Sequence, residues 1–126
     1  MHPARSLLAT ALLLATPALA QEALPAQVGE CTETNIAEIG PRLMMDDANF
    51  ESGVGVSYTT GLGQVSYDRV QEVIDSQAGD PVRMCLVFVP ENCPPGDDRD
   101  RIHDTTNLRT GGTWSMADAQ HECGGA

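Results

Sequence analysis

Residues 56–68 read VSYTTGLGQVSYD, so the triplet Val-Ser-Tyr occurs twice, with its two copies nine residues apart. Gly61 and Leu62 lie midway between the copies, and a glycine at the first tip position suits a type II′ turn of two residues. In that register each tyrosine lies opposite a valine, and all four side chains share one face. The predicted pairs are Tyr58 with Val65 and Val56 with Tyr67. The repeat is therefore interpreted as one amphipathic β-hairpin.

Further strands are predicted on both sides of this hairpin. Residues 34–43 (TNIAEIGPRL) suggest a strand interrupted at Gly40-Pro41, and the polar residues 46–53 suggest a loop. Residues 82–89 form the most apolar run, which is expected at the centre of a sheet. Residues 105–116 read as a second hairpin around Thr110-Gly111-Gly112, with Trp114 turned inward.

Two short helical segments complete the predicted fold. Asp68 and Gln71 have the spacing of a capping box, so a helix is expected to start there and to end at Gly79, with an irregular segment as the alternative because the stretch contains β-branched residues. Ser115 to Asp118 is a second candidate for a helical turn. The predicted fold class is mainly β: a small, disulfide-stapled antiparallel sheet or barrel with one or two short helices.

The first twenty residues have the pattern of a signal peptide. Arg5 precedes an apolar run from Leu7 to Ala15, and Ala18-Leu19-Ala20 is a small-x-small cleavage signal. The run is shorter than the about 20 residues that a membrane-spanning helix needs. We therefore expect residues 1–20 to be removed and residues 21–126 to form a single β-rich domain in the periplasm or outside the cell, with no membrane insertion after cleavage. A retained N-terminal anchor is the alternative.

Acidic residues dominate the charge of the chain. The sequence has 18 aspartates and glutamates against seven arginines, no lysine, and a net charge of −11. Nucleic acids and anionic membranes attract proteins that carry a positive patch, so this balance argues against both as partners. A basic protein is the partner that the charge favours.

Four cysteines follow the predicted leader, and an even number in an exported chain predicts two disulfides. The pairing favoured from sequence is Cys85 with Cys93, across the turn at Pro90-Glu91-Asn92, and Cys31 with Cys123, which would join the two ends of the domain. A zinc site is the competing interpretation, but the chain contains no Cys-x-x-Cys pair. We expect neither a metal nor a cofactor at these thiols.

The segment CPPGDDRDRIHD holds the densest group of carboxylates, at Asp97, Asp98, Asp100 and Asp104. Calcium binds six to eight oxygens, so this loop is a candidate cation site. Arg99 and Arg101 are interleaved with the carboxylates, which favours a loop that neutralises itself instead.

His103 and His121 are the histidines that remain after the predicted cleavage, and each has a carboxylate as its neighbour in sequence. They are the candidates for a general base or, with Glu122, for a metal site. No Gly-x-Ser-x-Gly or similar nucleophile motif accompanies them. The sequence therefore favours a protein that is not an enzyme, with a small enzyme using His103 or His121 as an alternative.

Ser52-Gly53 followed by Tyr58 loosely resembles the Ser-Gly-x-x-Tyr loop of periplasmic lysozyme inhibitors, with two extra residues before the tyrosine. That family consists of small exported β-barrels whose loop enters the active cleft of lysozyme. The resemblance implies that Ser52, Gly53 and Tyr58, with Gly61 and Leu62 at the hairpin tip, contact a partner. Lysozyme is basic, so an acidic protein would be steered toward it.

A broader resemblance covers nearly all of the predicted mature chain. The stretches GDPVRMCLV, NCPPGDDR, TTNLRTG and DAQHECGGA, in this order, are similar to those of a group of small exported bacterial proteins. That similarity implies export and a frame of four cysteines, and it implies no particular activity. The prediction is a non-catalytic binding module for a cationic protein such as lysozyme, with a structural or accessory component of the cell envelope as the alternative.

Overall fold

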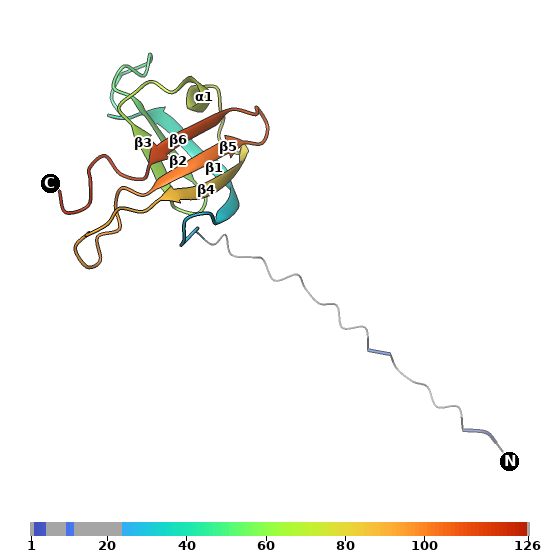
Figure 1. The fold of residues 1–126 in the computed structure, drawn as a ribbon. Coiled ribbons are helices and arrows are strands. Elements are labelled where there is room, and N and C mark those ends of the chain that lie inside the picture. The colour runs from blue at the N-terminus through green and yellow to red at the C-terminus, as the bar shows by residue number, and fades with distance from the viewer. Residues whose placement is uncertain (1, 5–9, 12–23, 126) are drawn as a thin grey trace.

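A computed structural model describes residues 2–4, 10–11 and 24–125, and the predicted signal peptide lies mostly outside these residues. The described chain folds into six antiparallel strands and one short helix (Figure 1). The elements are β1 (Cys31–Pro41), β2 (Val54–Tyr58), β3 (Gly63–Ser66), α1 (Gln71–Ile74), β4 (Pro81–Phe88), β5 (Ile102–Asn107) and β6 (Thr113–Ala117). The predicted mainly β fold is confirmed. None of the described helical residues forms a segment long and apolar enough to cross a membrane.

The strands close into a barrel in the order β1-β2-β3-β6-β5-β4, with β4 returning to β1. Most neighbours are joined by four or more residue pairs, but β3 and β6 meet at a single pair, Val65 with Ala117. β1 is continuous through Gly40 and Pro41, so the predicted interruption there is wrong. It contains a bulge between Ile36 and Glu38, where its pairing with β2 shifts.

The β2–β3 hairpin exists, but its predicted register is wrong. The amide N–H of Tyr58 donates to the carbonyl of Leu62 at 2.9 Å, and that of Gly61 donates to Tyr58 at 2.9 Å. Gly61 has a φ of 89° and ends a three-residue tip, a common hairpin loop that needs a left-handed residue at this place. Val56 therefore pairs with Gln64 and not with Tyr67. The register moves by three residues, an odd number, so Val65 and Tyr67 leave the inner face.

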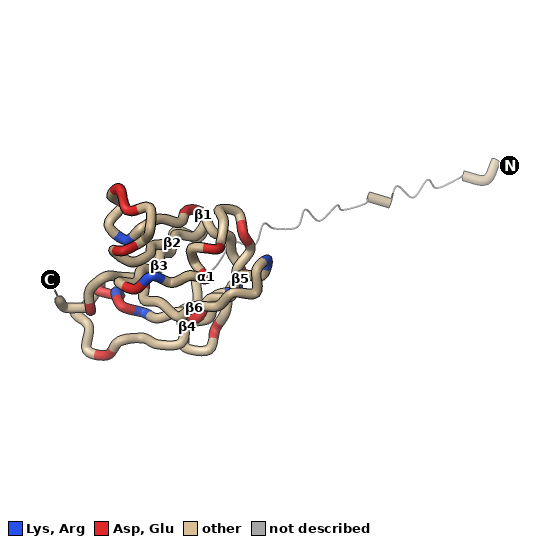
Figure 2. The backbone as a smooth tube through the Cα atoms, turned by 90° about the horizontal axis from the view of Figure 1, so that it is seen from above, with Lys and Arg blue, Asp and Glu red and all other residues tan. Residues whose placement is uncertain are grey.

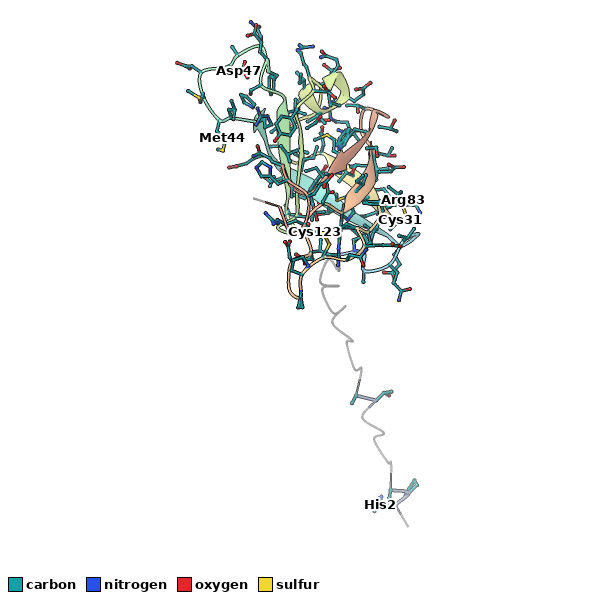
Figure 3. The ribbon with its side chains drawn as sticks, turned by 60° about the vertical axis from the view of Figure 1, so that its left-hand side comes forward. His2, Cys31, Met44, Asp47, Arg83 and Cys123 are labelled. Atoms are coloured by element: carbon teal, nitrogen blue, oxygen red, sulfur yellow. A yellow bond between two sulfur atoms is a disulfide. The ribbon has the colours of Figure 1, made fainter. Side chains whose placement is uncertain are left out.

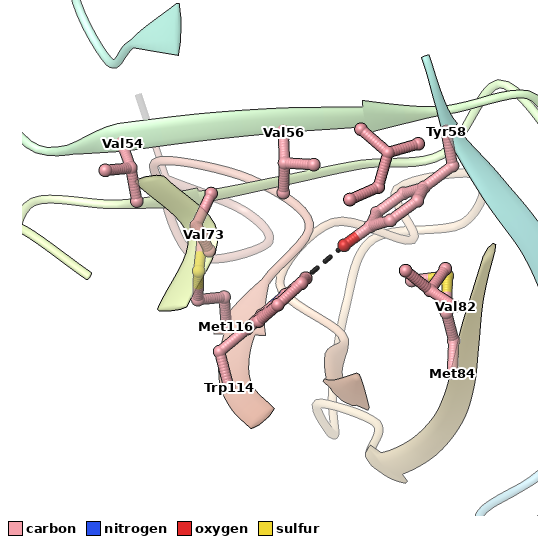
Figure 4. Packing of buried hydrophobic residues seen from close by; sticks show 9 residues of the cluster. Val54, Val56, Tyr58, Val73, Val82, Met84, Trp114 and Met116 are labelled. Atoms are coloured by element: carbon pink, nitrogen blue, oxygen red, sulfur yellow. Dashed lines mark hydrogen bonds between the residues drawn. The ribbon is translucent and has the colours of Figure 1, made fainter. Parts of the chain in front are cut away.

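Along each strand, successive side chains point alternately into the barrel and out toward solvent. Inward residues are apolar on β2 and β4, whereas β5 contributes His103, Thr105 and Asn107. Figure 4 shows how Val54, Val56 and Tyr58 face Trp114, Met116, Val82 and Met84 across the core. Trp114 is 5% exposed, as its predicted inward position requires.

α1 lies across one end of the barrel, and its Val73 is fully buried in the core (Figure 1). The helix is shorter than predicted, and its first residue follows Val70 without any side-chain capping bond. The helix ends at Ile74, before Gly79 is reached, and the Gly79 N–H instead donates to the carbonyl of Ile36 on β1. The expected helical turn from Ser115 is also absent, since β6 continues through Ala117.

Two disulfides are present, as predicted, but their pairing differs from the prediction. Cys31 binds Cys85, and Cys93 binds Cys123. Cys31 and Cys85 are directly opposite each other in the β1–β4 pair, so the first bond crosses the strands that close the barrel. The second bond joins the loop after β4 to the C-terminal segment. Disulfides persist in oxidising compartments, so the protein belongs outside the cytoplasm.

Candidate functional site

The residues that resemble the lysozyme-inhibitor loop do not form an exposed binding surface. Tyr58 is only 2% exposed and lies in the barrel interior. Ser52 donates its hydroxyl to Asp47 at 2.7 Å. Gly53, with a φ of 107°, lies so close to β3 that a Cβ atom there would be 2.0 Å from the carbonyl oxygen of Ser66. Gly61 is exposed at the hairpin tip, whereas Leu62 packs against the core.

Tyr58 instead belongs to a buried polar cluster centred on the side-chain amide of Gln64. The Gln64 oxygen accepts hydrogen bonds from Tyr58 Oη at 2.5 Å, Thr105 Oγ1 at 2.9 Å and Trp114 Nε1 at 3.0 Å. Its nitrogen donates to the carbonyls of His103 and Met116, each at 3.0 Å. Trp114 Nε1 also contacts Tyr58 Oη at 3.3 Å (Figure 4). Burial raises the pKa of Tyr58 to about 12, so its hydroxyl stays protonated at neutral pH.

The acidic loop does not gather its carboxylates. Asp97 accepts hydrogen bonds from Arg99 and from the amide of Gly124, and the bond to Arg99 holds its pKa well below the usual range. Asp104 is exposed on β5, where it pairs with Cys85 and Ser115 on the neighbouring strands. In the described part of the chain, no three histidine, cysteine or acidic side chains approach closely enough to hold a metal ion.

The two candidate histidines occupy different environments. His103 points into the barrel and is 2% exposed, and its Nδ1 atom has no hydrogen-bond partner among the described residues. Burial lowers the pKa of His103, although the nearby Asp118 opposes that shift. Asp118 accepts hydrogen bonds from the amides of Asp100 and Arg101, and burial raises its pKa. His121 is exposed, so the structure does not combine the histidines into one site.

A buried carboxylate at the opposite end of β5 is fully paired. Asp80, 4% exposed, accepts hydrogen bonds from Arg109 Nε at 2.5 Å and from Asn107 Nδ2 at 2.9 Å. The bond to Arg109 holds the pKa of Asp80 well below its usual range. Because Asp80 also accepts the Gln77 amide, this cluster ties the α1–β4 connection to the β5–β6 turn. Its role is structural.

Three consecutive exposed apolar side chains lie in the loop between β1 and β2, at residues 42–53, which we call the Met loop. Leu43, Met44 and Met45 are 49%, 86% and 71% exposed. Figure 3 shows Met44 and Asp47 on this loop, far from Cys31 and Cys123. The sequence-based prediction placed Leu43 in a strand at 34–43 and began the polar loop only at residue 46, so these exposed residues were missed. The sequence does contain a signal for them. The run Leu43-Met44-Met45 is apolar although it comes after Gly40-Pro41, where the strand pattern is interrupted.

Hydrogen bonds within the Met loop keep it ordered. The Asp47 carboxylate accepts the amides of Glu51 at 2.8 Å and Ser52 at 2.9 Å, in addition to the Ser52 hydroxyl. These bonds, with the Ser52 hydroxyl first, lower the pKa of Asp47. Phe50 packs inward against the core. The loop therefore presents its apolar tip from a fixed base.

A groove of about 560 Å³ adjoins the Met loop on the β1–β2 surface. Such a volume falls within the range of small-ligand sites, about 300–1,000 Å³. Its lining includes Ile39, Gly40, Pro41, Met44 and Gly55, with Glu38 and Arg42 as the charged members. This groove and the Met loop together form the candidate binding site. No protein-family model, curated protein or solved structure matches the chain.

Proposed function

We propose that the protein is a small, non-catalytic binding domain that acts in the periplasm or outside the cell and binds a basic protein through the Met loop. The observation that carries this proposal is the run of three exposed apolar side chains, Leu43, Met44 and Met45, at the tip of an ordered loop. Burying one such side chain in an interface contributes about 1.5–3 kcal/mol. Methionine also adapts its shape to varied partner surfaces.

The backbone of the Met loop supports a role in binding. Met44 has a φ of 50°, a left-handed conformation that is uncommon for a residue other than glycine, asparagine or aspartate. Such strain costs about 1–3 kcal/mol and tends to occur at functional sites. Met44 gains little packing within the described chain in return, since 86% of its surface is exposed. A partner that covers Met44 would explain why the conformation is kept.

Charge supports a basic partner. Asp46, Asp47 and Glu51 lie in the Met loop itself, and the whole chain carries −11. Figure 2 shows acidic residues distributed over the surface loops, with basic residues much rarer. A field of this sign speeds encounters with positively charged proteins and suppresses encounters with acidic ones. Location outside the cytoplasm follows from the disulfides, and the predicted leader supports export to the periplasm or beyond.

Binding to lysozyme, used as a basic probe, tests the proposal by titration calorimetry or surface plasmon resonance. We expect Leu43→Ser to weaken binding about tenfold, because it removes apolar contact area from the interface. Leu108→Ser is the matched control, since Leu43 and Leu108 are both 49% exposed but lie on different loops. We expect this control to leave the affinity unchanged.

Salt provides the second arm of the same experiment. Raising ionic strength from about 20 mM to about 500 mM shortens the range of charge interactions, so the association rate is expected to fall. If lysozyme and other basic proteins of varied shape all fail to bind at low salt, the proposal is wrong. It is equally wrong if Leu43→Ser and Leu108→Ser weaken binding to the same degree.

A further inference from the structure

Two glycines lie directly opposite each other in the groove beside the Met loop. Gly40 on β1 pairs with Gly55 on β2, and both line the groove. A Cβ atom on Gly40 would meet nothing within 4 Å, and one on Gly55 would meet only the Gly40 carbonyl oxygen at 3.9 Å. Neither residue has a positive φ. The described chain thus has room for side chains at both positions.

Glycine inside a strand is unfavourable, because it loses more conformational freedom on folding and offers no side chain for packing. Gly53 shows the usual structural reason for a glycine, since a Cβ atom there would collide with β3. Gly40 and Gly55 have no such reason within the described chain. Strand glycines also occur where a ligand or another chain approaches the backbone closely. The pair therefore leaves a floor of half-buried backbone without side chains, which an external group can approach closely.

The charges of the groove indicate the sign of that group. Glu38 lines the groove, is exposed, and makes no salt bridge or side-chain hydrogen bond within the described chain. Arg42 is already engaged: Nε donates to Ser52 O at 2.6 Å, and its guanidinium lies 4.2 Å from the centre of the Tyr67 ring. These partners are neutral but hold the Arg42 guanidinium in place, so Glu38 is the charged side chain of the groove left without a partner among the described residues, and a cationic group would pair with it.

We propose that this groove binds an arginine side chain of the basic partner. The guanidinium is planar, so it can lie flat over the Gly40–Gly55 floor while its N–H groups donate to Glu38. Its aliphatic stem would lie against the apolar surface of Pro41 and Met44, which also line the groove. Lysine carries the same charge but has no flat face, so it fits this floor less well. The inference rests on the proposed function and specifies the chemistry of the contact.

Two peptides of equal charge, hexa-arginine and hexalysine, test the inference by titration calorimetry at low salt. We expect the wild-type protein to bind hexa-arginine about tenfold more tightly than hexalysine. Gly55→Ala places a methyl group on the floor and is expected to remove most of that preference, with its melting temperature no lower than that of the wild type. Glu38→Gln is expected to weaken hexa-arginine binding about tenfold.

Gly63→Ala is the matched control. Gly63 starts β3 outside the groove, has no positive φ, and accepts a Cβ atom at an ordinary 3.6 Å from Val56 O. We expect it to keep the arginine preference of the wild type. Should Gly55→Ala lower the melting temperature, Glu38→Gln decides the question without altering the backbone.

Equal affinity for the two peptides, or an arginine preference that survives both Gly55→Ala and Glu38→Gln, overturns the inference. These results differ from failure of the proposed function. If lysozyme binds and Leu43→Ser weakens it while the peptides show no arginine preference, the Met loop binds its partner without the groove. If neither the basic proteins nor the peptides bind, both proposals fail.

Discussion

A single side-chain amide, that of Gln64, organises the polar interior of the barrel. It connects β3 to β2, β5 and β6 through five hydrogen bonds. A buried polar group is acceptable only when its hydrogen bonds are made, and here donors and acceptors satisfy one another. The cluster lets a chain with five aromatic residues, two of them buried here, fill a barrel without a large apolar core.

Replacing Gln64 tests this view. Gln64→Leu removes the partner of the Tyr58 and Thr105 hydroxyls and of two backbone carbonyls in a buried site, and it leaves the Trp114 indole N–H only its longer contact with Tyr58 Oη. We expect the free energy of unfolding to fall by at least about 3 kcal/mol, because each buried unpaired group costs about 1–3 kcal/mol. Urea denaturation measures the change. Gln77→Leu is the control, since Gln77 is exposed, and a similar loss in both variants would contradict the role given to Gln64.

Asp80 contributes to stability in a way that depends on pH. Its pKa is lower in the folded protein than in the unfolded chain, because Arg109 donates to its carboxylate. This contribution is fully present above the unfolded pKa, about 3.9, and is lost as the pH falls through the folded pKa. Asp80→Asn is expected to cost about 2 kcal/mol at neutral pH. The melting temperatures of wild type and Asp80→Asn should keep their difference from pH 7 down to about pH 4 and begin to converge only below it, as the pH approaches the folded pKa, and curves that stay parallel there would argue against this pairing.

At the scale of elements, the Met loop and the β2–β3 hairpin show what the sequence could and could not predict. The existence of the hairpin follows from its alternating pattern and from Gly61. Its register does not, because a three-residue tip and a two-residue tip both place Gly61 near the bend. The apolar run Leu43-Met44-Met45 is visible in the sequence, but its exposure depends on the hydrogen bonds around Asp47. Those bonds join residues whose spacing matches no familiar motif.

The order of the Met loop should depend on Asp47. Asp47→Ala removes the acceptor of two backbone amides, so we expect the amides of Glu51 and Ser52 to exchange with solvent faster and lysozyme binding to weaken. Asp46→Ala is the matched control, since it removes the same charge from the neighbouring exposed residue. Hydrogen–deuterium exchange with mass spectrometry measures the exchange rate of these amides. Equal effects of the two variants would show that charge, and not order, governs the loop.

At the scale of the whole molecule, the number of disulfides was predictable and their pairing was not. An even set of cysteines predicts two bonds, but which bonds form depends on which strands become neighbours. β1 and β4 are far apart in sequence and adjacent in the barrel, so Cys31 meets Cys85 and not Cys123. The groove was equally unpredictable, because it lies where Gly40 and Gly55 come together from two strands.

Each disulfide should contribute substantially to the free energy of unfolding. The bonds span 54 and 30 residues of sequence. In the loop-entropy model each is worth about 4 kcal/mol, a large part of the about 5–15 kcal/mol expected for a small domain. We expect the double variants Cys31→Ser/Cys85→Ser and Cys93→Ser/Cys123→Ser each to lower the midpoint of urea unfolding. An unchanged midpoint in either variant would show that the bond does not constrain the unfolded chain.

The backbone pairing between β3 and β6 consists of a single residue pair, so it is the weakest strand pairing of the barrel. Neither covalent crosslink spans that contact: one joins β1 to β4, and the other joins the segments that follow β4 and β6. Mild heat should therefore open the cylinder lengthwise between these two strands into a curled, cross-linked sheet before the remaining strands separate. Such a species would expose Gln64 and Trp114 while both sulfur bridges stay intact, and the fluorescence of the one tryptophan would report it ahead of global melting.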